Sequence, residues 1–220
     1  MTRDRPYRDR RAAGRALAKE PALHRPGPPP LILALPRGGV PVAAEIADAL
    51  NAPLDVFLVR KLGLPDHPEL AMGALASGGV RVLDAALIES ARVTPEELAA
   101  VLKREAAELE RREQRYRQGR PLADVRDRPV IVVDDGLATG FTLRAAIGAL
   151  RRAGCRDLTV AVPVGAASSC ADLAEEVETL VCPLRPHPFH AVGLWYDKFE
   201  ATSDDEVIAC LAHHLDRHAA

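Results

Sequence analysis

Residues 130–142 read VIVVDDGLATGFT, and this stretch decides the fold that we expect for the chain. The four apolar residues at 130–133 predict a short strand that is covered on both faces. Asp134 and Asp135 come next, followed by a turn of small and hydroxylated residues. Thr142 then opens a segment whose apolar residues recur at helical spacing. A buried strand that leads through a glycine turn into an amphipathic helix is typical of a parallel α/β sheet.

The same alternation continues on both sides of this stretch. Apolar runs at 31–35, 54–59, 158–164 and 178–182 predict further strands, with helices between them. We therefore expect an α/β fold with a doubly wound, mainly parallel sheet. In such a sheet, ligands bind at the carboxyl ends of the strands, so the loops that follow these strands become candidate sites.

We divide the chain into three parts. Residues 1–30 are an N-terminal arm, with a short basic helix over 7–20 and an extended, proline-rich linker after it. Residues 31–183 form the core, and residues 184–220 are a C-terminal segment and helix. Within the core, Thr94 predicts the start of a helix that runs to about residue 118, because Glu97 completes a capping box with it.

Composition excludes several classes of protein. The 220 residues carry 29 Lys and Arg against 31 Asp and Glu, a net charge of −2, which gives no field for binding nucleic acid. No apolar run approaches the roughly 20 residues that span a bilayer, so we expect no membrane association. The Arg-rich start has no apolar stretch after it, which argues against a secretory signal. Four scattered cysteines lack zinc-site spacing and indicate reduced thiols in a cytoplasmic protein.

The loop after residue 133 carries the chemistry. Its backbone amides and the helix N-terminus form an anion pocket, to which the hydroxyls of Thr139 and Thr142 add donors. The two acids beside it suit sugar hydroxyls or a hydrated Mg²⁺. The combination fits a ligand with a phosphate at one end and a vicinal diol in the middle. The alternative is an ordinary strand-to-helix turn with a capping threonine.

Residues 130–142 resemble the phosphoribosyl-pyrophosphate (PRPP) binding signature of type I phosphoribosyltransferases. Residues 36–39, Pro-Arg-Gly-Gly, resemble that family's pyrophosphate loop, and Arg60-Lys61 after the second expected strand resembles its basic site. The similarity extends from residue 31 to about residue 200. It implies the type I phosphoribosyltransferase fold, with a small hood built from the N- and C-terminal segments. Taken alone, residues 37–39 could instead be a simple turn, because glycine tolerates positive φ.

The resemblance also implies a role for each matched residue. Asp134 and Asp135 would hold the ribose hydroxyls and Mg²⁺, and they count with Arg37 and Lys61 as the catalytic residues. The residues implied for the 5′-phosphate are Gly136, Leu137, Ala138, Thr139, Gly140 and Thr142. The residues implied for pyrophosphate are Arg37, Gly38, Gly39, Arg60 and Lys61.

The aromatic segment 188–197 resembles the hood of purine-type enzymes. There Phe189 and Trp195 would stack on the acceptor, and Asp197 would meet a metal-bound water. The alternative is that these aromatic side chains only fasten the hood to the rest of the protein.

Residues 63–79 are rich in proline and glycine and weakly patterned. We expect either a flexible flap that closes over PRPP, as the resemblance implies, or a disordered connection. His67, His187 and His190 are expected to be exposed side chains without a catalytic role.

The sequence thus predicts an enzyme that binds Mg²⁺–PRPP and transfers ribose 5-phosphate to a nitrogenous base or nucleotide, releasing pyrophosphate. Ala138 stands where purine enzymes carry an aspartate, so the acceptor is left open. The alternative is a non-catalytic protein that senses PRPP or a nucleotide. A dinucleotide-dependent oxidoreductase is excluded, because the first strand lacks a GxGxxG turn. The oligomeric state is also left open, with a homodimer as one alternative.

Overall fold

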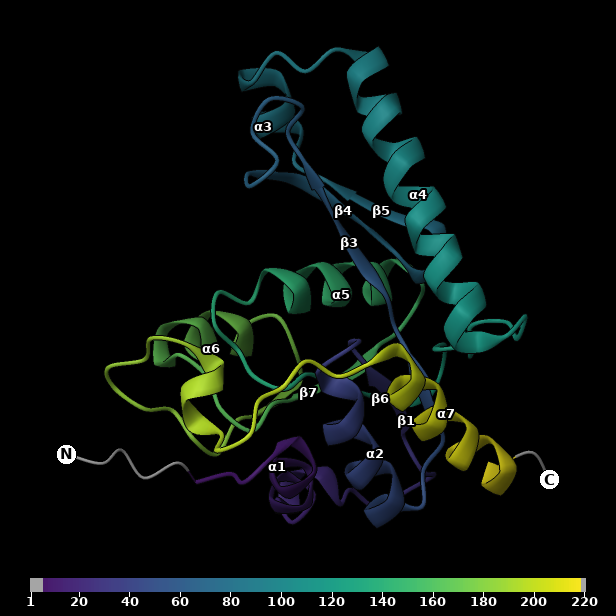
Figure 1. The fold of residues 1–220 in the computed structure, drawn as a ribbon, viewed down its shortest axis with the longest axis vertical. Helices are drawn as coiled ribbons and strands as arrows, with labels where there is room; N and C mark the ends of the chain where they lie inside the picture. The colour runs from purple at the N-terminus through teal and green to yellow at the C-terminus, as the bar shows by residue number, and fades with distance from the viewer. Residues whose placement is uncertain (1–5, 219–220) are drawn as a thin grey trace.

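The computed structural model describes residues 6–218, and within them five parallel strands form the central sheet. Their order is β2-β1-β6-β7-β8, so the chain reverses its winding direction between β1 and β6 (Figure 1). The strands are β1 (Leu31–Ala34), β2 (Leu54–Val56), β6 (Pro129–Val133), β7 (Asp157–Ala161) and β8 (Thr179–Val181). The predicted mainly parallel α/β sheet is confirmed, with each strand somewhat shorter than its apolar run.

Helices cover both faces of this sheet, as Figure 1 shows. Along β1, Ile32 and Ala34 face the cluster that contains α2, whereas Leu31 and Leu33 face the cluster that contains α5. This alternation explains why the whole run had to be apolar. The first face carries α1 (Arg10–Leu17), α2 (Gly39–Leu50) and α7 (Asp204–His218), and the second carries α5 (Phe141–Arg152) and α6 (Ala167–Ala174).

A separate antiparallel sheet is inserted between β2 and β6 and stands away from the central sheet in Figure 1. The expected strand over 54–59 is wrong, because β2 ends at Val56 and the chain then enters this second sheet. The expected irregular stretch at 63–79 is wrong as well, since most of it is paired as β4 or forms a 3₁₀ turn. The insertion consists of β3 (Val59–Gly63), β4 (Ala71–Ala76), η2 (Ser77–Gly79), β5 (Val80–Leu83), α3 (Ala85–Ser90) and α4 (Pro95–Arg117).

The long helix α4 begins as predicted. Thr94 accepts a hydrogen bond from the amide of Glu97, whose carboxylate accepts one from the amide of Thr94. The helix ends at Arg117, one residue earlier than expected, because Gln118 adopts a left-handed conformation. Arg117 is buried and pairs with buried Asp55 of β2 over 3.2 Å, which fastens the insertion to the central sheet.

The N-terminal and C-terminal segments meet at one edge of the molecule. Tyr7 forms a parallel bridge with Tyr196, and its carbonyl accepts a hydrogen bond from the amide of Asp197 over 2.9 Å. The Tyr7 hydroxyl donates to the carbonyl of Pro163 in the core over 3.0 Å. These contacts form the small hood that the sequence predicted. The predicted helix over 7–20 is shorter, since Asp9 caps α1 and residues 21–23 form the 3₁₀ helix η1 (Pro21–Leu23).

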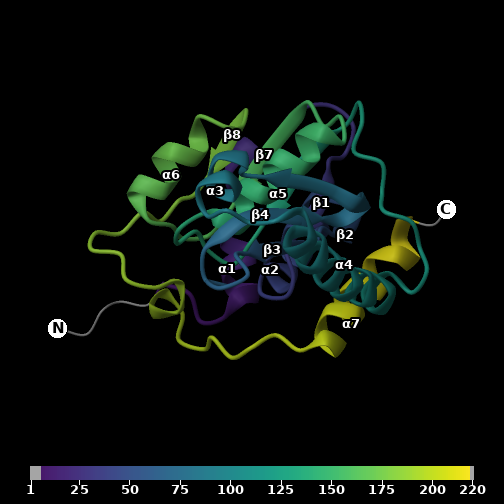
Figure 2. The same ribbon diagram turned by 90° about the horizontal axis from the view of Figure 1, so that it is seen from above.

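Figure 2 shows the chain between β8 and α7 running around the outside of the molecule. This segment contains the 3₁₀ helix η3 (Val192–Trp195). Among the described residues, 6–218, no helix combines the length and apolar character required to cross a membrane.

Candidate active site

Two loops meet at the carboxyl ends of adjacent strands. β1 and β6 are paired, and the amide of Leu35 donates to the carbonyl of Val133 over 2.9 Å, so both loops leave the sheet side by side. A Cβ on Gly38 would overlap the carboxylate of Asp135, and one on Gly39 would come within 2.6 Å of the carbonyl of Val133. Glycine is therefore required at both positions for close approach and not for an unusual φ.

The loop after β6 encloses a cavity of about 150 Å³. Leu137 is buried and anchors the loop, because its amide donates to the carbonyl of Val164 and its carbonyl accepts from the amide of Ala166. Gly140, with a φ of 77°, is the N-cap of α5. The first residues of α5 line the cavity, so the amide end of that helix faces it. The cavity is lined by Asp134, Gly136, Leu137, Ala138, Thr139, Gly140, Phe141, Thr142, Leu143 and Val192.

The two adjacent acids after β6, of which Asp134 lines the cavity, are in different electrostatic surroundings. Burial raises the pKa of Asp134 well above its usual range, and the neighbouring charge of Asp135 raises it further. Burial also raises the pKa of Asp135, but the guanidinium of Arg10 opposes this rise. The Arg10 Nε lies 2.8 Å from Oδ2 of Asp135. The negative charge of Asp135 is therefore compensated by a neighbouring cation to a greater degree than that of Asp134.

Arg37 stands on the loop after β1, at the cis peptide bond between Pro36 and Arg37. Its guanidinium lies 3.6 Å from the carboxylate of Asp204, at the start of α7. The same carboxylate also accepts a hydrogen bond from the hydroxyl of Tyr116 over 2.6 Å and pairs with Arg115 over 2.8 Å. Arg37 is thus close to the end of α4 as well as to the start of α7.

Arg60 and Lys61 lie inside β3 and not at the end of a parallel strand, so their expected position is wrong. The apolar run that precedes them continues from one sheet into the other, and the pattern alone does not mark the break. Arg60 donates two hydrogen bonds to Glu105 of α4, and Lys61 donates one to the carbonyl of Glu69 over 3.0 Å. Their role in binding pyrophosphate stays a prediction.

The aromatic side chains of the hood mainly pack against each other. Phe189 and Trp195 are half-buried against the cluster of Tyr7 and Tyr196. The Trp195 Nε1 is buried, and among the described residues it has no hydrogen-bond partner. This packing is what the fastening alternative expects, and the role of the two rings in acceptor binding stays a prediction.

Asp197 is exposed on the hood. Within residues 6–218, no three His, Cys, Asp or Glu side chains gather as a metal site, so Asp197 does not complete such a group with Asp134 and Asp135. The three histidines expected to be exposed, His67, His187 and His190, are all exposed.

Three residues at the site were missed from the sequence: Arg10, Tyr196 and Asp204. The Tyr196 hydroxyl donates to the carbonyl of Asp135 over 2.6 Å. The only signal for Arg10 was its place directly after Asp9, a good helix cap that fixes where α1 begins. Its contact with Asp135 spans 125 residues, and local spacing does not reveal such a distant pair.

The model of the phosphoribosyl transferase domain matches residues 8–185. The chain belongs to the phosphoribosyl transferase family. Two proteins of Mycobacterium tuberculosis, from strains CDC 1551 / Oshkosh and ATCC 25618 / H37Rv, are 44% identical to it over 205 residues. Their names give them as phosphoribosyl transferases whose activity is unproven. The match covers 93% of this chain and 46% of each relative, so the chain spans about half their length.

The fold is also that of a solved relative. The crystal structure of TT1426 from Thermus thermophilus is 40% identical and aligns with a TM-score of 0.81. The alignment covers 94% of this chain and 98% of TT1426. The overall fold is therefore shared over nearly the whole of both chains.

Proposed function

We propose that this phosphoribosyl transferase binds Mg²⁺–PRPP and transfers ribose 5-phosphate to a nitrogenous base with release of pyrophosphate. One observation carries the proposal. The cavity of loop 136–142 opens beside Asp134, while Asp135 lies against Gly38 of the neighbouring loop. The loop cavity, the two acids and the glycine loop after β1 are thus neighbours, which supports a ligand that carries phosphate groups on both sides of a sugar.

The 5′-phosphate would bind in the cavity. Backbone amides of residues 138–140 and of the start of α5 would supply donors, and exposed Thr139 and Thr142 would add hydroxyls. The amide of Leu137 already donates to the carbonyl of Val164, so Leu137 would contribute by shaping the loop. Asp134 and Asp135 would accept hydrogen bonds from the ribose hydroxyls next to it.

Pyrophosphate would leave toward the loop after β1. As the glycosidic bond stretches, negative charge accumulates on the leaving group, and the Arg37 guanidinium with the amides of Gly38 and Gly39 would stabilise it. The guanidinium of Arg37 must first leave the carboxylate of Asp204 before it can pair with the anion. Arg60 and Lys61 are retained as further ligands for this group, each of which must also give up its present partner.

The acid pair fits Mg²⁺. This ion binds through one or two carboxylates together with substrate phosphates and keeps several waters, so a cage of three acidic side chains is not needed. Asp134 and Asp135 would hold it, with Asp197 as the proposed contact to a bound water. When bound, the ion would neutralise charge on the phosphates.

The acceptor would enter from the hood, where Phe189 and Trp195 are the proposed stacking residues. Ala138 is exposed at the cavity and has no proton to exchange with a base, so base selection must come from other groups. We also propose that the protein works in the cytoplasm, because all four cysteines are free thiols. A homodimer remains the proposed alternative to a monomer.

Calorimetry with PRPP and Mg²⁺ tests the proposal. We expect saturable binding by the unmodified protein and its loss in the double variant Asp134→Asn with Asp135→Asn. The matched control, Asp124→Asn with Asp127→Asn, removes the same charge from the loop before β6 and should bind normally.

Release of pyrophosphate across a panel of bases then separates the two functions. Release with one base supports the transferase. Tight binding without release from any base would favour a PRPP sensor instead, and unchanged affinity in the acid-pair variant would overturn the site.

A further inference from the structure

Arg10 links the acidic pair to both parts of the hood. It belongs to α1, yet its Nε donates to Oδ2 of Asp135 over 2.8 Å. Its Nη1 donates to the carbonyl of Glu200 over 2.6 Å, and its guanidinium carbon lies 3.8 Å from the centre of the Phe199 ring. One side chain of α1 thus contacts both the C-terminal segment and the loop after β6.

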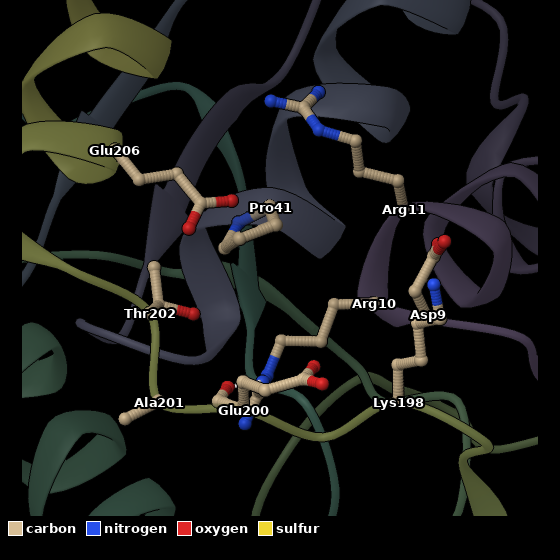
Figure 3. Close-up of a pocket in the computed structure, with 9 residues that line it drawn as sticks. All are labelled: Asp9, Arg10, Arg11, Pro41, Lys198, Glu200, Ala201, Thr202 and Glu206. Carbon is tan, nitrogen blue, oxygen red and sulfur yellow. Dashed lines mark hydrogen bonds between the residues drawn. The ribbon is translucent and has the colours of Figure 1, made fainter.

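The contact between Arg10 and Asp135 is partly shielded from water. The side chains of Arg10 and Asp135 are 12% and 17% exposed, which strengthens a charge-assisted hydrogen bond between them. Figure 3 shows the Arg10 side chain extending from α1 toward Glu200 along the wall of a pocket. The pocket has a volume of about 240 Å³.

The Asp135 carboxylate lies where the two loops and α1 meet. It lies between Arg10 and Gly38, and Arg10 Nε would be only 3.2 Å from a Cβ on Gly38. The carboxylate is therefore held at the junction of the two loops by a cation that comes from outside the core. Neighbouring Asp134 has no such cation among the described ion pairs.

We propose that Arg10 is a positioning residue for PRPP binding. It fixes the Asp135 carboxylate against the loop after β1 and compensates its charge, so that the site accepts a substrate with several negative charges. This inference rests on the proposed function. Without Arg10, two adjacent uncompensated acids would face the substrate phosphates, and Asp135 would be free to turn away from Gly38.

Arg11 offers a matched control, because it is the next residue of the same helix and carries the same charge. Its guanidinium pairs with Glu45 over 3.3 Å and donates to the sulfur of Cys210 over 3.4 Å, away from the acidic pair. Arg10→Gln and Arg11→Gln therefore change the net charge of α1 equally, but only Arg10→Gln removes a contact with the acidic pair.

The first measurement is PRPP affinity by calorimetry with Mg²⁺. We expect Arg10→Gln to weaken binding by about tenfold or more, the size expected for a lost charge-assisted hydrogen bond, and Arg11→Gln to leave it unchanged. Arg10→Lys should recover part of the loss, because an ammonium can pair with Asp135 but lacks the planar fork that also reaches Glu200. Equal affinities in the two glutamine variants would overturn the proposal.

The second measurement needs no substrate. Amide hydrogen exchange of the peptide that covers residues 134–140 should become faster in Arg10→Gln and stay unchanged in Arg11→Gln. Unchanged exchange in both would overturn the positioning role. If Arg10→Gln does not fold, Phe199→Leu removes the ring beneath the guanidinium without changing the charge, and it should give a smaller change in the same direction in both measurements.

The two proposals fail in different ways. Absence of PRPP binding by the unmodified protein overturns the proposed function and, with it, this role for Arg10. Normal binding by the unmodified protein and by Arg10→Gln overturns only the role of Arg10.

Discussion

The hydroxyl of Tyr196 donates a hydrogen bond to the backbone carbonyl of Asp135 over 2.6 Å. Burial is the larger of two effects that raise the pKa of the Tyr196 phenol, and the nearby charge of Asp135 is the other. The hydroxyl therefore keeps its proton and can donate the hydrogen bond. The contact joins the hood to the loop that carries both acids, and it does so through the backbone. Hood and acidic pair are therefore connected twice, through Tyr196 and through Arg10.

We expect Tyr196→Phe to lower the free energy of unfolding by about 1 kcal/mol, the typical contribution of one hydrogen bond. It should also weaken PRPP binding, because the backbone of Asp135 loses a support. Urea unfolding and calorimetry measure the two effects. Tyr7→Phe is the matched control, since it removes a similar bond to the carbonyl of Pro163. Equal effects on PRPP binding would show that the Tyr196 contact has no special role.

Gly39→Ala should destabilise the protein by about 1–3 kcal/mol, the usual cost of overpacking. The added methyl group would meet the carbonyl of Val133 and the Cα of Asp134, and backbone atoms cannot turn aside. Gly148→Ala is the control, because it lies within α5 and its methyl group would meet only Val82 at 3.6 Å. We expect that variant to be about 0.5–1 kcal/mol more stable. Urea midpoints measure both, and equal midpoints would contradict the close approach of the loops.

Asp55→Ala should lower the free energy of unfolding by about 1.5–3 kcal/mol, because the buried guanidinium of Arg117 loses one of its two carboxylate partners and keeps only Glu113. Thermal unfolding should also become less cooperative, since this pair fastens the insertion to the central sheet. Asp124→Ala breaks an exposed pair with Arg126 and should leave the midpoint unchanged. Similar midpoints in the two variants would contradict this account.

Asp204 predicts a pH-dependent contribution to stability. The hydrogen bond from the Tyr116 hydroxyl, followed by the charge of Arg115, lowers the pKa of Asp204 from 3.8. A depressed pKa in the folded protein means that its stabilisation is present above pH 3.8 and is lost as the pH falls through the folded value. Asp204→Asn should therefore be less stable than the unmodified protein at pH 7, by about 1 kcal/mol, and the difference should shrink in acid.

Unfolding midpoints across this pH range check that expectation. Asp205→Asn is the neighbouring control, because its side chain is 92% exposed and lies 3.7 Å from Arg115. It should show little change at either pH. A difference for Asp204→Asn that persists undiminished in acid would contradict the assignment.

The central sheet could be predicted because its strands are buried on both faces. Ile32 and Leu33 face different clusters and are both fully buried, so nearly every position had to be apolar. The insertion could not be predicted in the same way. Val56 and Val59 belong to different sheets, although the two residues between them are also apolar and mark no break. The register of β3 with β4 shifts between Leu62 and Gly63, so the alternation of side chains there does not predict the pairing.

The candidate site shows the same division. Loops 36–39 and 134–142 follow strands of one parallel sheet, so the strand pattern alone predicts that they lie at the same edge of it. Arg10 and Tyr196 reach Asp135 from far along the chain, and their contacts depend on how the hood packs. No local sequence pattern around Arg10 or Tyr196 predicts that either residue contacts Asp135.

The bridge between Tyr7 and Tyr196 has a consequence for synthesis on the ribosome. The first helix leaves the exit tunnel long before its partners do, because chains grow from the N-terminus. The sheet from β1 to β8 can assemble before residues 196–200 have emerged to contact Arg10. A nascent chain would thus have a folded sheet before the acidic pair has gained its contacts with Arg10 and Tyr196.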